Sequence, residues 1–521
     1  MQRRISIVLS LMLVAAAAIC QTDDIVEVTF LQMNDVYEIT PVEGGKYGGM
    51  ARVATIRKEL ARENPNTYMV LAGDFISPSA MGTSVYDGKR INGIHMIDAL
   101  NSVGVDFVTF GNHEFDLGYE ALQRCIDRSR FTWISSNIAY TPSVEGYVKA
   151  FEKNVDGRSE PFPEWYIIRA KNASGTELKI GVIGLTIGSN KPAYVVWSDP
   201  LESAQRVYNE MKGQVDIAIA ITHLSIEQDK KLATLLPALR FILGGHEHTN
   251  MMFKVGETII SKADANARTV FIHRLRWSSV RQSLAVTSEV KTVDATVADD
   301  SATAGVVREW SSRAYSGFRE KGFDPERVVA TLREPLDGRE SSIRFRQTNL
   351  GALICSAMIA AAKQSRVALF NSGSIRLDDE LAGTITEYDV IRTLPFGGKI
   401  VEVKMKGSLL QRVLNAGMQN AGIGGYLQYA GITSRMKSEH GKPPVTEWWI
   451  EGKPLRTKRT YAVVVSDYLF SGREQGLDFF SRANREVVSI SEPDGNDSSD
   501  VRRDIRLAVI RHLKNESTRP R

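Results

Sequence analysis

The chain has 521 residues, which is more than one hydrophobic core usually serves, so two domains are the first expectation. Apolar residues make up 43% and charged residues 24% of the sequence, as is ordinary for a soluble globular protein. The net charge of +4 is too small to indicate binding to nucleic acid or to a membrane surface. The three cysteines, Cys20, Cys125 and Cys355, make neither a disulfide framework nor a cysteine metal site. Any metal must therefore have oxygen and nitrogen ligands.

The first twenty residues are predicted to be a signal peptide. Arg3 and Arg4 precede a short apolar run, residues 5–19, with small residues near its end, which is the pattern of a secretion signal. The run is short for a membrane span, and no other stretch is apolar enough to cross a membrane once the signal is removed. We therefore expect a secreted, periplasmic protein. A buried N-terminal strand and a lipid anchor at Cys20 are the alternatives.

The following 270 or so residues alternate between two periodicities, which predicts an α/β layered domain. Helical patterns span residues 50–62, 91–102 and 203–212. Short β-rich runs recur at residues 26–31, 68–71, 105–110, 180–183, 217–221, 241–243 and 258–260. A linker rich in Asp, Ala, Ser and Thr (residues 294–304) and a helical stretch (residues 305–321) then lead to a second globular region, residues 328–513.

The first region is most informative where its strands end, because five of them run into side chains that can bind metals. In open α/β sheets, ligand sites form at the carboxyl ends of the strands. Four of the eight histidines lie at these ends, an ordered series that random placement would not give. The side chains are, in chain order, those of Asp35, Asp74, Asn112 with His113, His223, and His246 with His248.

These residue types suit a pair of divalent cations. A bridging carboxylate can hold two ions about 3.5–4 Å apart, where they clamp both the attacking and the leaving oxygen of a phosphoryl displacement. Neutral imidazoles and an amide oxygen complete the coordination without adding much negative charge near an anionic substrate. Glycines at Gly73, Gly111, Gly244 and Gly245 would let the backbone turn sharply beside the ions. A lone Asp or His after a strand is more often a turn or packing residue, so the prediction rests on the combination.

The motifs at these strand ends resemble those of the calcineurin-like metallophosphoesterases, and most closely the 5'-nucleotidase branch that includes the UDP-sugar hydrolases. They are NDVY (residues 34–37), GD (73–74), GNHEFD (111–116), TH (222–223) and GGHEH (244–248). The resemblance implies an N-terminal four-layer αββα sandwich (residues 24–300) after a signal peptide (1–20). A linker helix (301–322) and an α+β substrate-binding domain of the 5'-nucleotidase C-terminal type (323–515) would follow.

The same resemblance implies a role for each residue. Asp74 would bridge the metals, Asp35 and His248 would belong mainly to one ion, and Asn112, His223 and His246 would belong to the other. His113 would face the phosphate to stabilise the transition state or protonate the leaving oxygen, with Asp116 orienting it, as suits an imidazolium held by a carboxylate. Two divalent or mixed-valence ions are therefore expected, with Mn, Zn, Fe, Ca and Mg all open.

One position departs from the family pattern, because Tyr37 stands where the first motif usually carries a histidine. A neutral phenol is a poor ligand, whereas a phenolate suits a hard, oxidising ion such as ferric iron. Three interpretations of Tyr37 therefore stay open: it binds a metal, it hydrogen-bonds to a metal-bound water, or it leaves one metal site weakened.

The second region resembles the family's substrate-binding domain in three motifs, RFRQTNLG (residues 344–351), FNSGSIR (370–376) and LPFGG (394–398). By that match Arg344 and Arg376 would grip phosphate or carboxylate, Asn371 would hydrogen-bond to the substrate, and Phe396 and Tyr468 would stack on a base. Arginine is apt because its planar fork can hold anionic oxygens with two hydrogen bonds. The alternative is that Phe396 is a core residue and the arginines are surface charges. The loop after Tyr468 is altered, so either Glu474 or Asp478 could fit the acid that contacts ribose hydroxyls.

These features predict a hydrolase whose partner is a small phosphoester and not a nucleic acid. Nucleoside 5'-monophosphates are the leading substrates, with nucleotide sugars and 2',3'-cyclic nucleotides as additions. Two alternatives are a thiosulfohydrolase or general phosphatase on the same fold, and a nucleotide-binding protein with weak turnover. Because the motifs divide between the two regions, the active site is expected in the cleft between the domains, with domain rotation admitting substrate; the oligomeric state stays open.

Overall fold

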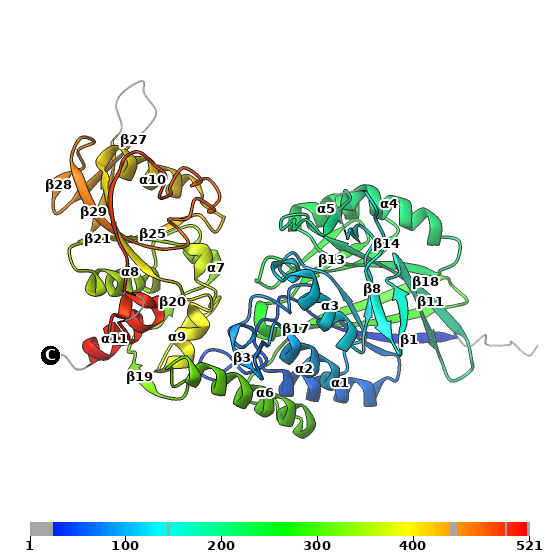
Figure 1. Cartoon of the computed structure of the whole chain (residues 1–521). Helices are drawn as coiled ribbons and strands as arrows, with labels where there is room; N and C mark the ends of the chain where they lie inside the picture. Colours follow the sequence, from blue (N-terminus) through cyan, green and yellow to red (C-terminus); the bar gives the residue numbers. More distant parts are fainter. Residues whose placement is uncertain (1–23, 143–145, 438–444, 495–496, 518–521) are drawn as a thin grey trace, which may run out of the picture.

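We describe a computed structural model of the chain that covers residues 24–142, 146–437, 445–494 and 497–517. The predicted signal peptide, including Cys20, lies outside these residues. Among the helices of the described ranges, none is both long and apolar enough to cross a membrane. The described chain forms two bodies joined by one long helix, with the N-terminal body built on two stacked sheets (Figure 1).

Two six-stranded sheets form the centre of the N-terminal domain. In spatial order the first consists of β18 (Ser283–Thr292), β17 (Thr269–Ser278), β1 (Ile25–Met33), β2 (Thr67–Ala72), β5 (Phe107–Thr109) and β6 (Thr132–Trp133). The second consists of β10 (Trp165–Lys171), β11 (Glu177–Thr186), β13 (Ile217–His223), β14 (Leu239–Gly244), β16 (Thr258–Lys262) and β15 (Met251–Val255). Within each sheet the central strands run parallel, as β1 with β2 and β13 with β14.

Apolar side chains fix the order of the layers. Strands of both sheets share one core, in which Val70 of β2 and Ile219 of β13 are buried. The outer face of the first sheet packs against α1 (Met50–Glu63), α2 (Ile94–Val103) and α3 (Tyr119–Arg128), and that of the second against α4 (Pro200–Met211) and α5 (Ile226–Leu235). Because each helix has one apolar face, it covers a sheet and leaves its other face to solvent. The predicted four-layer αββα sandwich is confirmed.

The linker helix, α6 (Ser301–Glu320), runs along α1 and α2 and reaches the C-terminal domain (Figure 1). It begins four residues before the stretch predicted from the sequence, because the Asp300 carboxylate accepts a hydrogen bond from the Thr303 amide and so caps the helix. The start at residue 301 agrees with the linker helix (301–322) that the family resemblance implied, whereas the linker predicted from composition, residues 294–304, ends at residue 300. The helix is fixed to the N-terminal domain by the hydrogen bond from Ser84 Oγ to the Ala314 carbonyl, at 2.7 Å.

The C-terminal domain is α+β, as predicted. Its five-stranded sheet has the order β25 (Leu427–Ala430), β21 (Val367–Asn371), β29 (Thr460–Ser466), β24 (Ile400–Lys406), β30 (Val487–Ser491). The helices α8 (Asn349–Ala361) and α11 (Ile505–Ser517) pack together on one side, and α10 (Gly407–Gln419) contributes to a second core. A smaller sheet holds β26 (Ile432–Lys437), β27 (Val445–Ile450) and β28 (Lys453–Pro454). The short α7 (Glu340–Ile343) and α9 (Glu387–Thr393) face the N-terminal domain (Figure 1).

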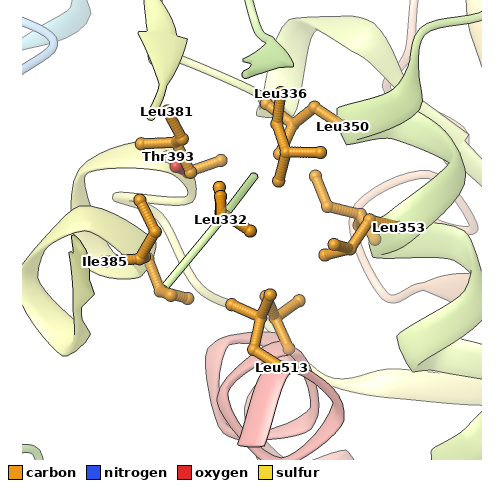
Figure 2. A pocket seen from close by; sticks show the side chains of 11 residues that line it. Leu332, Leu336, Leu350, Leu353, Leu381, Ile385, Thr393 and Leu513 are labelled. Atoms are coloured by element: carbon orange, nitrogen blue, oxygen red, sulfur yellow. The ribbon is translucent and has the colours of Figure 1, made fainter. Parts of the chain in front are cut away.

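One cavity inside this domain is too small and too apolar to bind an anionic substrate. Leucines from several elements, with Ile385 and Thr393, point into it (Figure 2). It holds about 10 Å³, close to the least that one water needs. Among the described residues, no charged side chain lines it. We regard it as a packing gap between α8, α9 and α11.

Candidate metal centre and substrate site

The carboxyl ends of β1, β2, β5, β13 and β14 meet at one edge of the two sheets and bring the predicted ligands together. Ligand atoms of Asp35, Asp74 and His248 all lie within 4.8 Å of one another. Asp35 and Asp74 are buried, with exposed fractions of 0% and 1%. Burial alone would raise the pKa of both carboxyls, but neighbouring histidines hold both values below the usual range. Two buried, ionised carboxylates this close need cations to compensate them.

Two buried atoms at this edge have no hydrogen-bond partner among the described residues: Asn112 Oδ1 and His223 Nε2. The other ring nitrogen of His223 donates to the carbonyl of Ala72 at 2.8 Å, so Nε2 carries the free lone pair when the ring is neutral. Nε2 lies 3.2 Å from Asp74 Oδ2 without hydrogen-bonding geometry. Buried polar atoms are rarely left unpaired, and these two are the atoms that the sequence predicts to bind a metal.

His246 lies beside them, with its ring centre 5.3 Å from that of His223. Burial and the nearby charge of His223 lower the pKa of His246 to about 4. A neutral imidazole is the form that binds metal ions. His223 Nε2 also lies 3.9 Å from Asp35 Oδ1, so the ligands predicted for one ion adjoin those predicted for the other. The assignment of Asn112, His223 and His246 to one ion, and of Asp35 and His248 to the other, stays a prediction.

Tyr37 joins the Asp35 and His248 side. Its hydroxyl lies 3.0 Å from His248 Nε2, 3.2 Å from Asp74 Oδ2 and 3.4 Å from Asp35 Oδ1. Burial, with the negative charges of Asp74 and Asp35, raises the pKa of Tyr37 well above its ordinary value. The side chain is therefore placed where the family's histidine would act, in an environment that favours the neutral phenol.

The backbone at the centre adopts conformations that most residues avoid. Asp35, Asp74, His246 and His248 have positive φ angles of 53°, 55°, 93° and 58°. Such angles are uncommon outside glycine and cluster at functional sites. Gly111 is required by close approach, because a Cβ there would lie 2.0 Å from Asp74 Oδ1. The role predicted for the glycines at these turns is thereby supported at Gly111.

Two charged residues that sequence analysis did not single out hold these loops in place. The Glu114 carboxylate accepts hydrogen bonds from the amides of Asp74, Phe75, Ile76 and Gly111, at 2.6–3.0 Å. Burial and the charge of Asp74 raise its pKa to about 7. The fully buried Lys262 donates to the carbonyls of Leu224 and Gly245, at 2.6 and 2.8 Å, beside two of the histidines. Glu114 could have been found from the sequence, because it is the acid inside the motif at residues 111–116. No sequence pattern indicated a role for Lys262.

His113 lies at the rim of the centre, with its side chain 21% exposed. Its Nδ1 is 2.7 Å from Asp116 Oδ2, as the predicted orienting role requires. Asn190 Nδ2 donates to the other Asp116 oxygen at 2.6 Å. On the far side, Arg376 Nη2 of the C-terminal domain lies 3.2 Å from His113 Nε2. The two domains therefore meet at this site, as the division of the motifs predicted.

Further contacts cross the domain boundary beside His248. Its Nδ1 lies 2.7 Å from Asp378 Oδ2, and Glu340 Oε2 is 3.8 Å away. Arg344 Nη1 pairs with Glu340 Oε1 at 2.8 Å. The predicted phosphate-binding arginines thus lie beside the predicted metal centre, with Arg376 against His113 and Arg344 paired with Glu340, which faces His248. No pattern in the sequence indicated Asp378 or Glu340.

The remaining predicted substrate residues lie on loops of the C-terminal domain. Phe396 and Tyr468 are 58% and 41% exposed, so Phe396 is not the core residue that the alternative required. Asn371 is buried, and its Nδ2 donates to Glu474 Oε2 at 2.7 Å. Asp478 is exposed. Of the two candidate acids, Glu474 is the one that stands beside the other predicted substrate residues.

The donor set fits divalent metal ions. Asp35, Asp74 and His248 bring oxygen and imidazole ligand atoms together, and Asn112 Oδ1 and His223 Nε2 are buried ligand atoms without a hydrogen-bond partner among the described residues. Oxygen and imidazole ligands of this kind suit Mn, Zn and Fe, and the carboxylates suit Mg and Ca as well.

Comparison with known proteins agrees with this architecture. The sequence model of the calcineurin-like phosphoesterases matches residues 28–250, and that of the 5'-nucleotidase C-terminal domain matches residues 328–482. A 5'-nucleotidase of Vibrio cholerae is 28% identical, with 89% of this chain and 90% of that protein aligned. A 5'-nucleotidase of Bos taurus is 26% identical over 86% of this chain and 83% of that protein.

Solved structures share the fold. A 5'-nucleotidase precursor from Thermus thermophilus superposes with a TM-score of 0.73 at 23% identity, covering 94% of this chain and 97% of that one. A sulfate thiohydrolase from the same genus gives a TM-score of 0.66 at 16% identity, with 95% of each chain covered. The two matched domains, in this order and with these motifs, place the chain in the 5'-nucleotidase family of calcineurin-like phosphoesterases, and it is a hydrolase of phosphoester bonds.

Proposed function

We propose that this protein hydrolyses nucleoside 5'-monophosphates at a two-metal centre in the cleft between its domains. The observation that carries the proposal is the contact between Arg376 and His113, which sets a phosphate-binding arginine of one domain against the catalytic histidine of the other. The relatives named as 5'-nucleotidases support a nucleotide as the substrate. Export to the periplasm is part of the proposal and rests on the sequence pattern of residues 1–20.

Each ion would have its own ligands around Asp74. One would be held by Asp35 and His248, with Tyr37 beside them, and the other by Asn112, His223 and His246. Bound there, the pair would polarise the phosphoryl oxygens and lower the pKa of the attacking water. Glu114 keeps Asp74 in position through hydrogen bonds to the amides of both loops.

The residues around the substrate then have separate tasks. Arg376 Nη2 donates to His113 Nε2 at 3.2 Å. A phosphate oxygen that entered between them could accept hydrogen bonds from the guanidinium and from a protonated His113. Asp116 holds Nδ1 of His113, so that Nε2 can stabilise the developing charge or deliver a proton to the leaving oxygen. Phe396 and Tyr468 would stack on the base, and Glu474 would accept from ribose hydroxyls, supported by its bond to Asn371.

Purified protein tests the proposal. We expect phosphate release from AMP, loss of that activity in EDTA and its return with Mn²⁺ or Zn²⁺. UDP-glucose, 2',3'-cyclic AMP, a simple alkyl phosphate and a thiosulfonate conjugate are assayed in parallel. Equal rates on AMP and the alkyl phosphate would make it a general phosphatase. Sulfate release without phosphate release would make it a thiosulfohydrolase, and binding of AMP without turnover would make it a binding protein.

A further inference from the structure

Two histidines of the metal centre are oriented in the same way by partners of different origin. His223 turns Nε2 to the centre and binds the Ala72 carbonyl through Nδ1 at 2.8 Å. His248 also turns Nε2 to the centre, 3.2 Å from Asp35 Oδ1, while its Nδ1 meets Asp378 Oδ2 at 2.7 Å. Ala72 belongs to the same domain as its histidine, whereas Asp378 belongs to the other domain.

We propose that Asp378 is a positioning residue for His248, so that closure of the C-terminal domain completes the metal centre. The inference rests on the proposed two-metal function. A carboxylate that accepts the Nδ1 proton of an imidazole fixes the tautomer and the ring orientation and makes Nε2 a stronger ligand. When the domains separate, water would replace Asp378 as the partner of Nδ1. A water molecule neither fixes the orientation of the ring nor carries the negative charge that makes Nε2 a stronger ligand.

The surroundings of Asp378 fit such a role. Its side chain is buried between the domains, and its other oxygen accepts a hydrogen bond from the Glu340 amide at 2.8 Å, which holds the carboxylate in place. Its φ of 50° lies in the left-handed region, so the backbone is bent at this residue. Arg376, two residues before, reaches His113. One short segment therefore contacts both a predicted metal ligand and the catalytic histidine.

The His248–Asp378 contact should also couple metal binding to domain closure. If closure raises metal affinity through the His248–Asp378 bond, then a bound metal must favour closure by the same factor. The fully loaded centre would therefore be favoured when the phosphate-binding arginine is in place. An open molecule would hold the ion of the His248 side less firmly than the ion that depends on His223.

A purely structural role for Asp378 gives a different expectation. Its bond to the Glu340 amide stabilises the start of α7, which leads to Arg344. Loss of that bond would disturb substrate binding and raise KM. It would leave metal affinity unchanged, because every predicted ligand, from Asp35 to His248, lies in the N-terminal domain.

The test measures binding of Mn²⁺ alone to the metal-free, full-length protein, by calorimetry and by electron paramagnetic resonance. We expect Asp378→Ala to weaken one of two Mn²⁺ sites about 10- to 100-fold, as loss of such outer partners usually does. Asp378→Asn retains an acceptor oxygen and should fall between Asp378→Ala and the wild type. Glu486→Gln is the matched control, because Glu486 pairs with Ser408 and Arg412 inside the C-terminal domain and should leave both sites unchanged.

The outcomes separate the inference from the function on which it rests. A wild-type protein that binds no Mn²⁺ would count against the proposed metal centre itself. Two wild-type sites that keep their affinity in both Asp378 variants would overturn the positioning role. Thermal unfolding in EDTA shows whether Asp378→Ala is folded. If it is not, the decision rests on Asp378→Asn, for which unchanged affinity at both sites would equally overturn the inference.

Discussion

The two halves of the active site are built in opposite ways. Asp35, Asp74 and His223 are almost inaccessible and are held by the strands of one rigid sandwich. Phe396 and Tyr468 are about half exposed and sit on loops of the other domain. Chemistry at a phosphate depends on groups held at fixed positions, whereas recognition of a base requires surfaces that stay open until substrate arrives. Under the proposed function, each task would fall to the domain that suits it.

The contacts between the domains follow the same division between buried and exposed residues. Arg376 and Asp378 approach His113 and His248 directly, while the aromatic residues remain exposed. In this arrangement the two domains touch at the phosphate and metal end of the proposed site. Substitutions in the two halves should separate accordingly, with turnover affected most by the buried half and nucleotide preference by the exposed half.

Replacing the bridging residue should have the largest effect. In Asp74→Asn the neutral amide cannot hold two cations, and the ions supply several kcal/mol of transition-state stabilisation. We expect kcat to fall by about 10³-fold or more, since each 1.36 kcal/mol corresponds to tenfold. Metal analysis and AMP hydrolysis measure the result. Near-normal activity with both metals bound would contradict the bridging assignment.

The next effect concerns a residue that should not bind metal. His113→Asn should leave metal content near the wild-type value and reduce kcat by about 10²–10⁴, the usual contribution of a positioned acid–base group. Asp116→Asn, which weakens the bond to Nδ1, should reduce kcat less. If His113→Asn lost a metal, His113 would belong to the ligand set instead.

The buried half could be predicted from the sequence in most of its parts. Its ligands follow strands, and the parallel strands of one sheet end at the same edge, so Asp35 and Asp74 had to lie close together. What the sequence could not provide was the supporting network. From the sequence, Lys262 would be expected at the surface, as lysines usually are. In the structure it is buried at the end of β16 and donates to the carbonyl of Gly245.

The exposed half was predicted less completely, because its geometry depends on loops and on contacts between domains. Glu474 and Asp478 are equally plausible acids in the sequence, and only tertiary structure sets Glu474 against Asn371. Asp378 lies in an ordinary acidic pair with Asp379. Its contact with His248 joins positions 130 residues apart, which no local pattern can indicate.

A smaller and more selective effect should follow from the exposed aromatics. Stacking of a base on an aromatic ring is worth about 1–3 kcal/mol, so Phe396→Ala should raise KM for AMP by about 5- to 150-fold. Hydrolysis of a simple alkyl phosphate should be unchanged, because it has no base. Tyr166→Ala, at a tyrosine of β10 that is 39% exposed, is the control. An equal loss on both substrates would remove Phe396 from the base site.

The smallest effect is expected at Tyr37, where the buried half departs from its family. The environment of its hydroxyl favours a neutral phenol that donates a hydrogen bond to one of the two carboxylates within 3.4 Å. A hydrogen bond to a charged group is worth about 1.5–3 kcal/mol. Because this bond forms with and without substrate, only part of that free energy bears on the transition state, so Tyr37→Phe should lower kcat/KM by about 2- to 12-fold.

Spectroscopy and a second variant decide between the roles of Tyr37. We expect the iron-loaded protein to lack the visible charge-transfer band of a phenolate on ferric iron. Tyr37→His would restore the imidazole of the family motif at a position 3.2 Å from Asp74 Oδ2, so it should tighten Mn²⁺ binding. A visible band that disappears in Tyr37→Phe, with weaker metal binding in Tyr37→His, would make the tyrosine a true ligand. The buried half would then differ from its relatives in the ion that it selects.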